Sequence, residues 1–157
     1  LIMSKLIYGD RIGKTAVLSV GAAAIILIDD QKKVLLTRRS DNGRWCLPGG
    51  AMDPGESIEE TCVRETLEEV CLKVRITRLI GIYTNPNVIV EYEDGNRRQP
   101  IDMTFEAEVI DGELSLTDEI TDYGYFSVDS LNGLDIVELD FERIQDAVLN
   151  LPHAIMK

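Results

Sequence analysis

The chain has 157 residues, 45% of them apolar and 28% charged, which suits one globular domain with a core of its own. Its formal net charge of −12 argues against non-specific binding to nucleic acid or to an anionic membrane. Cys46, Cys62 and Cys71 lack CxxC spacing, so we expect reduced thiols in a cytoplasmic protein, with neither a disulfide framework nor a zinc site.

Most of the chain is predicted to form strands. Residues 1–14 have no clear period and fit either an edge strand or a loosely held arm. The strands that follow are apolar or alternating runs between polar turns, namely 15–28, 33–38, 45–47, 73–83, 88–92, 101–110 and 123–126. The apolar run within the first is too short to span a bilayer, so we expect a buried central strand. Pro48, Gly49 and Gly50 should break the regular structure and allow close approach of the backbone.

Two helices are predicted. The first covers residues 58–70, with Ser57 as its N-cap and Glu60 three residues later to complete a capping box. The second covers 140–149 and ends before a proline. Because strands and helices do not alternate regularly, a doubly wound parallel sheet is disfavoured. The pattern indicates an α+β fold in one domain, an α/β/α sandwich around a mixed, largely antiparallel sheet.

The first predicted helix carries carboxylates on one face. Glu65, Glu68 and Glu69 are spaced i, i+3, i+4 and point the same way, whereas Leu67 and Val70 point the opposite way. Like charges at these spacings destabilise a helix by a few tenths of a kcal/mol per pair, and the helix dipole disfavours anions in the last turns. A purely structural helix gains nothing from this arrangement, whereas a hard divalent cation would account for it.

A magnesium or manganese site is the chemistry that this face predicts. Both ions prefer oxygen ligands, and the three glutamates supply them within about one helical turn. The backbone at Gly49 and Gly50 could add a carbonyl ligand. Such a site would neutralise a polyphosphate and orient water for in-line attack on phosphorus, while Arg64 could hold one glutamate through a bidentate pair.

The spacing of these residues resembles the signature of the Nudix hydrolases. That signature is a Gly, five residues, a Glu, seven residues and then Arg-Glu-x-x-Glu-Glu. This chain has Gly50, Glu56 and the run 64–69 at those positions. The preceding run 45–50, Trp-Cys-Leu-Pro-Gly-Gly, also looks like the family's entry to the motif.

Two positions depart from the family pattern. Thr66 stands where the family usually has an aliphatic residue, and the change is mild because Thr has nearly the shape of Val. Cys71 replaces a Gly that would cap the helix. If the backbone there is left-handed, Cys costs about 1 kcal/mol relative to Gly. Neither departure removes a metal ligand.

The resemblance implies roles for particular residues. The three glutamates would bind metal, while Glu56 and Arg64 would support the loop and the helix. Family members often recruit a further acidic residue outside the motif, as a general base or an extra ligand, at a position that varies. Glu119 and Asp122 are the candidates here, because they lie in an acidic loop just before a predicted strand.

Several residues outside the motif have two readings. Arg38 and Arg39 contact either substrate phosphate or nearby acids, and Arg39 is the slightly better substrate candidate. Trp45 is expected to be core rather than a base-stacking platform, and Cys46 a packed residue rather than a nucleophile. His153 is given no catalytic role. The loop around Pro86 either shapes a substrate pocket or is a plain turn, through Tyr83, Asn85 and Asn87.

These observations predict Mg²⁺-dependent hydrolysis, with Mn²⁺ as the other metal, of a phosphoanhydride in a nucleoside diphosphate derivative. The substrate is left open between a nucleotide sugar such as ADP-ribose and a (d)NTP. One alternative is a non-catalytic Nudix module that binds a nucleotide for regulation, but it gives no reason to keep the costly glutamates. Another is an acidic ion-binding scaffold, which does not explain the glycine-rich entry. The sequence leaves the oligomeric state open, with a homodimer through exposed strands as one option.

Overall fold

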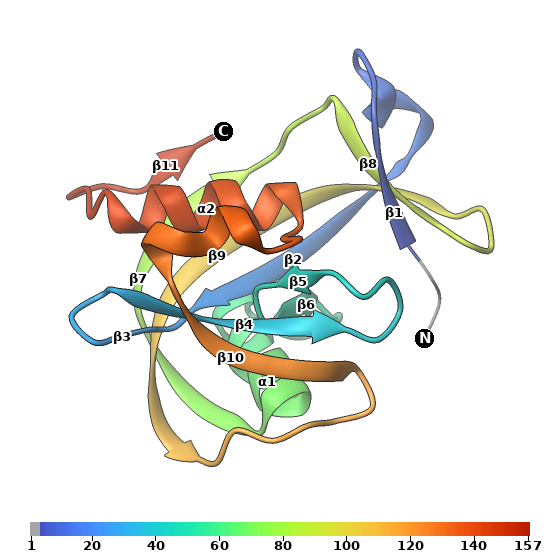
Figure 1. Ribbon diagram of the computed structural model, residues 1–157. Helices are drawn as coiled ribbons and strands as arrows, with labels where there is room; N and C mark the ends of the chain where they lie inside the picture. The colour runs from blue at the N-terminus through green and yellow to red at the C-terminus, as the bar shows by residue number, and fades with distance from the viewer. Residues whose placement is uncertain (1–3) are drawn as a thin grey trace.

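The computed structural model describes residues 4–157, and residues 1–3 of the predicted strand or arm lie outside them. Two sheets and two α-helices form the fold (Figure 1). In chain order the elements are β1 (Ser4–Tyr8), the 3-10 helix η1 (Ile12–Thr15), β2 (Val17–Ile25), β3 (Leu27–Ile28), β4 (Lys33–Arg39), β5 (Trp45–Cys46), β6 (Gly49–Ala51), α1 (Ile58–Val70), β7 (Leu72–Tyr83), β8 (Val88–Tyr92), β9 (Arg97–Gly112), β10 (Ile120–Ser127), the 3-10 helix η2 (Val128–Gly133), α2 (Glu138–Val148) and β11 (Ile155–Met156). In this part of the chain, every helix is too short or too polar to cross a bilayer.

The strands form one larger and one smaller sheet. The larger sheet has the order β1-β8-β9-β2-β6, with β7 also paired to β9 and β11 to β7. Within it β2 runs parallel to β9 and β11 parallel to β7, while the other pairs are antiparallel. The smaller sheet has the order β10-β4-β3, with β5 on β4, and all its pairs are antiparallel. The predicted mixed, largely antiparallel arrangement is therefore present.

The two helices pack on opposite faces of the larger sheet (Figure 1). Successive side chains of a strand point to opposite faces, and β2 shows this clearly. Ala24 packs in the same apolar cluster as Cys62 of α1, whereas Ile25 packs in the cluster that contains Ile144 of α2. Each face of the sheet thus has its own apolar core, which makes the layers of the sandwich.

Several predicted boundaries were wrong. The strand expected over 15–28 is interrupted at Ile26, and its first residue belongs to the preceding 3-10 helix. The two glycines expected to break the structure, Gly49 and Gly50, lie instead in β6 and pair with β2. The strands come so close there that a side chain at Gly49 would collide with the backbone of Ala22. Close approach was predicted correctly, but it serves strand pairing.

The buried face of α1 is rotated relative to the predicted one. Leu67, expected in the core, is 48% exposed, whereas Thr66 is fully buried and Glu69 is only 7% exposed. The Thr66 hydroxyl donates to the main-chain oxygen of Cys62 at 2.7 Å, so its burial leaves no unpaired hydroxyl. The rotation carries Glu69 from the solvent side of the helix toward the smaller sheet.

Candidate active site

Helix α1 is fixed at both ends. At its start the Ser57 hydroxyl accepts a hydrogen bond from the Glu60 amide at 3.2 Å, and the Glu60 carboxylate accepts one from the Ser57 amide at 2.7 Å. This is the predicted capping box. At its end Cys71 adopts the left-handed conformation, with φ 63°, and its amide donates to Leu67. The glutamates between these ends therefore project in defined directions.

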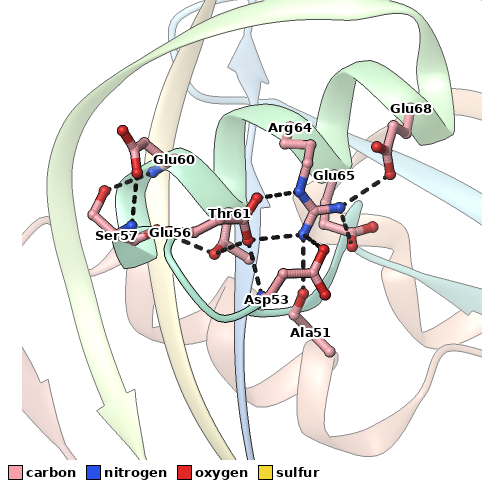
Figure 2. Close-up of polar contacts among 9 residues, drawn as sticks. All are labelled: Ala51, Asp53, Glu56, Ser57, Glu60, Thr61, Arg64, Glu65 and Glu68. Carbon is pink, nitrogen blue, oxygen red and sulfur yellow. Dashed lines mark hydrogen bonds and ion pairs between the residues drawn. The ribbon is translucent and has the colours of Figure 1, made fainter.

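Arg64 is the centre of a network on the exposed side of α1 (Figure 2). Its guanidinium donates to both oxygens of Glu56. Its Nη1 donates to Glu65 at 2.8 Å and to Glu68 at 3.1 Å, and its Nη2 to the carbonyl of Ala51. The hydrogen bonds from Arg64 are the main cause that lowers the pKa of Glu56 to about 2. Arg64, expected to hold one glutamate, contacts three.

Glu65 lies against Gly50 of strand β6. A side chain at Gly50 would overlap the Glu65 carboxylate, so glycine is what allows this approach. The Glu65 side chain is only 15% exposed, and burial raises its pKa although the hydrogen bond from Arg64 acts in the opposite direction. A carboxylate kept ionised in such a place favours a nearby cation.

Glu69 has quite different surroundings, on the side of the smaller sheet. Its Oε1 accepts a hydrogen bond from the Thr37 hydroxyl at 2.9 Å, and its Oε2 accepts one from the Gly49 amide at 3.3 Å. Burial raises the pKa of Glu69 to about 7, while these two hydrogen bonds favour the ionised form. This carboxylate is oriented by neutral donors.

The three predicted metal ligands are therefore divided. Glu65 and Glu69 both adjoin strand β6, at Gly50 and Gly49, whereas Glu68 is half-exposed and contacts Arg64. Across residues 4–157, no three His, Cys, Asp or Glu side chains are gathered as a ready-made metal site. The donor chemistry nevertheless fits a hard divalent cation, because desolvated carboxylate oxygens lie beside a backbone that side chains do not shield.

A cavity of about 580 Å³ lies beside strand β6. Residues 49–51 line one side of it, and the other walls come from β1, β8 and the first turns of α2. This volume is in the range of cavities that hold small ligands and cofactors. Strand β6 thus adjoins two features, the carboxylates of α1 and a space for a ligand.

A buried ion cluster lines the cavity near α2. Nη1 of Arg143 lies 2.8 Å from both Asp102 Oδ2 and Asp140 Oδ1. Asp140 also accepts a hydrogen bond from the Leu47 amide at 3.0 Å, which ties α2 to the segment that leads into the glycines. Burial raises the pKa of Asp102 to about 6, against the attraction of Arg143. Within the described residues, Asp102 Oδ1 and Arg143 Nε have no hydrogen-bond partner.

The two arginines of β4 have different roles. Arg39 lines the cavity and forms a two-point pair with Asp41, whose carboxylate is fully buried, at 2.7 Å for each bond. Arg38 is exposed and donates to the main-chain oxygen of Gly43. Arg39 therefore combines both readings, since it pairs with an acid and also faces the space for a ligand.

The candidate acids outside the motif differ in their effect on the glutamates of α1. Burial is the main cause of the raised pKa of Glu65 and Glu69, and the negative charge of Glu119 adds to it at both. Glu119 is exposed and lies close enough for this effect. Asp122 is also exposed, and it lies opposite Arg38 in the strand register of the smaller sheet. The effect of its charge on Glu65 and Glu69 favours Glu119 over Asp122 as the further acid.

Trp45 and Cys46 belong to the packing of the fold, as expected. The ring of Trp45 meets that of Phe126 edge-on, with centroids 4.8 Å apart, and packs against the core under α2. Cys46 is buried, which raises the pKa of its thiol to about 12, so it stays protonated and unreactive.

The loop around Pro86 reads mainly as a turn. The Asn85 side chain accepts a hydrogen bond from the Asn87 amide within it, and Asn87 accepts one from the Arg11 amide. Tyr83 is buried and donates to Asp146 at 2.9 Å. Tyr83 and Asn85 line a second, smaller cavity of about 180 Å³.

Sequence reasoning missed the residues that reach this region from other elements. Thr37 reads as an ordinary strand residue, and no sequence signal marks its contact with Glu69. Asp102 did carry a signal, since a lone acid between Ile101 and Met103 in an apolar strand is expected to be buried and paired. That expectation would have pointed to a buried arginine such as Arg143.

Comparison with known proteins gives a consistent picture. A family model described as the NUDIX domain matches residues 18–147. The ADP-ribose pyrophosphatase of Methanocaldococcus jannaschii is 34% identical over 121 residues, covering 75% of this chain and 66% of that protein. The nucleoside triphosphatase NudI of Enterobacter sp. (strain 638) is 32% identical over 99 residues, with coverage of 61% and 70%. The matched part is only 43% of the MutT-like protein of Streptomyces ambofaciens, so the chain spans less than two thirds of several relatives.

Solved structures show the same fold. A NUDIX hydrolase from Nitrosomonas europaea superposes with a TM-score of 0.68 at 28% identity, over 85% of this chain and 90% of that one. Another structure from the same organism gives a TM-score of 0.71 at 23% identity, over 89% and 77%. The predicted α+β sandwich is thereby confirmed.

Proposed function

This chain belongs to the Nudix family, and on that premise we propose that it hydrolyses a phosphoanhydride bond in a nucleoside diphosphate derivative. The observation that carries the proposal is the position of two desolvated carboxylates, Glu65 and Glu69, against the glycines of β6 beside a cavity of ligand size. Relatives named for ADP-ribose pyrophosphatase and nucleoside triphosphatase activity support this reaction class.

Mg²⁺, or Mn²⁺ in its place, would be held by Glu65, Glu68 and Glu69 with the main-chain oxygen of Gly50. When bound, the cation supplies charge neutralisation for the phosphates and activation of water. Arg64 keeps Glu65 and Glu68 oriented. Because Glu68 is 52% exposed, its pairing with Arg64 is weak and it can exchange this partner for a cation.

Glu119 would accept the proton of the attacking water or serve as a further ligand. It comes from the loop before β10, and its charge acts on both Glu65 and Glu69. It is exposed, so its carboxylate can reorient when substrate binds.

The cavity beside β6 would take the nucleotide. Arg39 would meet a phosphate there, and its two-point pair with Asp41 orients the guanidinium in advance. The space of about 580 Å³ suits either a nucleotide sugar or a nucleoside triphosphate. An activity assay with both classes of substrate therefore distinguishes them.

The test is a panel of nucleotide sugars, dinucleotides and nucleoside triphosphates, each with Mg²⁺, with Mn²⁺ and with a chelator. Wild type is compared with Glu68→Gln, Glu69→Gln and the control Glu59→Gln, an exposed glutamate at the start of α1. We expect metal-dependent turnover that both site variants reduce by more than tenfold, about 1.4 kcal/mol in the barrier, and that the control keeps. Nucleotide binding without turnover of any compound would favour the regulatory module instead.

A further inference from the structure

Glu69 is held by groups that lie outside its own helix. The Thr37 hydroxyl of β4 donates to Oε1 at 2.9 Å and the Gly49 amide of β6 to Oε2 at 3.3 Å, so each oxygen has its own donor. A third donor, the Thr117 hydroxyl, reaches the main-chain oxygen of Glu69 at 2.8 Å. Backbone and side chain of one glutamate are thus tied to three separate segments.

Thr37 is placed to act as a rigid donor. It is fully buried in the middle of the smaller sheet, where it pairs with Cys46 of β5 on one side and Tyr123 of β10 on the other. Its hydroxyl also lies 3.5 Å from the Cys46 sulfur. Because the hydroxyl proton is given to Glu69, the thiol is the donor in that second contact, which leaves the hydroxyl aimed at the carboxylate.

We propose that Thr37 is a positioning residue, whose hydroxyl holds the Glu69 carboxylate in the orientation that binds the cation. The inference rests on the function proposed above. A carboxylate oxygen has more than one acceptor site, so a hydrogen bond at Oε1 leaves capacity for a cation. Partners that orient metal ligands in this way change metal affinity or activity by about 10- to 100-fold when they are removed.

A neutral donor suits this task better than an arginine would. Arg64 orients Glu65 and Glu68 but places a positive charge beside them, which weakens their attraction for a cation. The Thr37 hydroxyl orients Glu69 without adding charge, so the attraction between the carboxylate and a divalent cation is kept. β4 also carries Arg39, two residues later on the same face, toward the cavity. One strand would therefore supply a ligand-orienting hydroxyl and a phosphate contact.

The experiment compares Thr37→Val, which removes the hydroxyl and keeps the shape, with Thr37→Ser, which keeps the hydroxyl. Mn²⁺ affinity of the full chain is measured by electron paramagnetic resonance without nucleotide, and kcat and KM are measured on the best substrate of the panel. We expect Thr37→Val to weaken Mn²⁺ binding about tenfold or more and to lower kcat with KM nearly unchanged. Thr37→Ser should stay within about threefold of wild type.

Thr66→Val is the matched control. Thr66 is equally buried, but its hydroxyl donates to the main-chain oxygen of Cys62 within α1. The control should keep the fold, because Val has nearly the shape of Thr, and leave Mn²⁺ affinity at the wild-type value. If Thr37→Val does not fold, Thr37→Ala takes its place with the same expected losses.

The outcomes separate the two proposals. Wild-type Mn²⁺ affinity and kcat in a folded Thr37→Val, or an equal loss in Thr37→Ser or Thr66→Val, overturns the role of Thr37 and leaves the hydrolase function standing. A wild-type protein that neither binds Mn²⁺ nor turns over any nucleotide overturns both.

Discussion

Glu68 and Glu69 are neighbours in one helix, yet they meet opposite surroundings. The Glu68 side chain is 52% exposed and pairs with Arg64, whereas Glu69 is 7% exposed and accepts hydrogen bonds from the neutral donors Thr37 and Gly49. One residue turns about 100° around a helix, so a single step carries a carboxylate from solvent to the seam between α1 and the smaller sheet. A motif defines the spacing of its acids, and the packing of other elements decides what each acid meets.

The largest effect should come from replacing the buried member of the pair. Glu69→Gln keeps the size of the side chain and removes its charge, and we expect kcat to fall by about 10³-fold at saturating Mg²⁺ because an oriented ligand is lost. The kcat of Glu68→Gln should fall by about 10- to 100-fold, since an exposed carboxylate is less well oriented. Initial rates on the best substrate measure both, and circular dichroism checks that both variants fold. Equal losses would show that burial does not distinguish the two glutamates.

Asp102 is a second buried carboxylate, and the pH dependence of protein stability tests what its burial costs. The pKa of Asp102 rises from 3.8 to about 6, so the folded state binds this proton more tightly than the unfolded state does. Its contribution to stability is present below pH 3.8 and is lost as pH rises through 6, by up to about 3 kcal/mol. We therefore expect the free energy of unfolding of Asp102→Asn, measured with urea, to rise relative to that of wild type between pH 4 and 6. Above that range the difference between the two should be constant.

The opposite slope would contradict this account. If the free energy of unfolding of wild type rises relative to that of Asp102→Asn as pH rises, the attraction of Arg143 outweighs the cost of burying the carboxylate. Asp122→Asn, an exposed change in the smaller sheet, serves as the control for replacing an acid by an amide.

What the sequence predicted well was local. The capping box at Ser57 and Glu60 and the limits of α1 depend on residues a few positions apart, and the structure confirms both. The left-handed backbone at Cys71 was only a condition in the sequence argument, and the structure supplies it with φ 63°. The mixed sheet also followed from the order of strands. The site was predictable only as far as the motif reaches along the helix.

What the sequence missed depends on contacts between distant segments. The contact of Thr37 with Glu69 joins residues 32 positions apart, and that of Leu47 with Asp140 joins residues 93 apart. No periodicity records such pairs. The same cause explains the error at Leu67, because the core face of α1 depends on which strands pack against the helix.

A smaller effect is expected from the exposed side of the comparison. Arg64→Lys keeps a positive charge but cannot make the paired hydrogen bonds to Glu56 or reach Ala51, Glu65 and Glu68 together. We expect kcat/KM to fall by about tenfold and the free energy of unfolding by about 1 kcal/mol. Wild-type values of both in Arg64→Lys would mean that charge alone, without the geometry of the guanidinium, supports the loop.

The smallest effect lies at the end of the same helix. Cys71 has φ 63° and ψ 21°, a conformation that costs about 1 kcal/mol for a residue with a side chain and little for glycine. Cys71→Gly should therefore raise the free energy of unfolding by about 1 kcal/mol and the melting temperature by about 2–4 °C. Cys71→Ala keeps the β-carbon and should show no such gain, which separates relief of backbone strain from loss of the thiol. The cap hydrogen bond from the Cys71 amide goes to Leu67 and to neither glutamate, so kcat should stay at the wild-type value. A change in kcat would show that the cap affects the direction in which the two glutamates point.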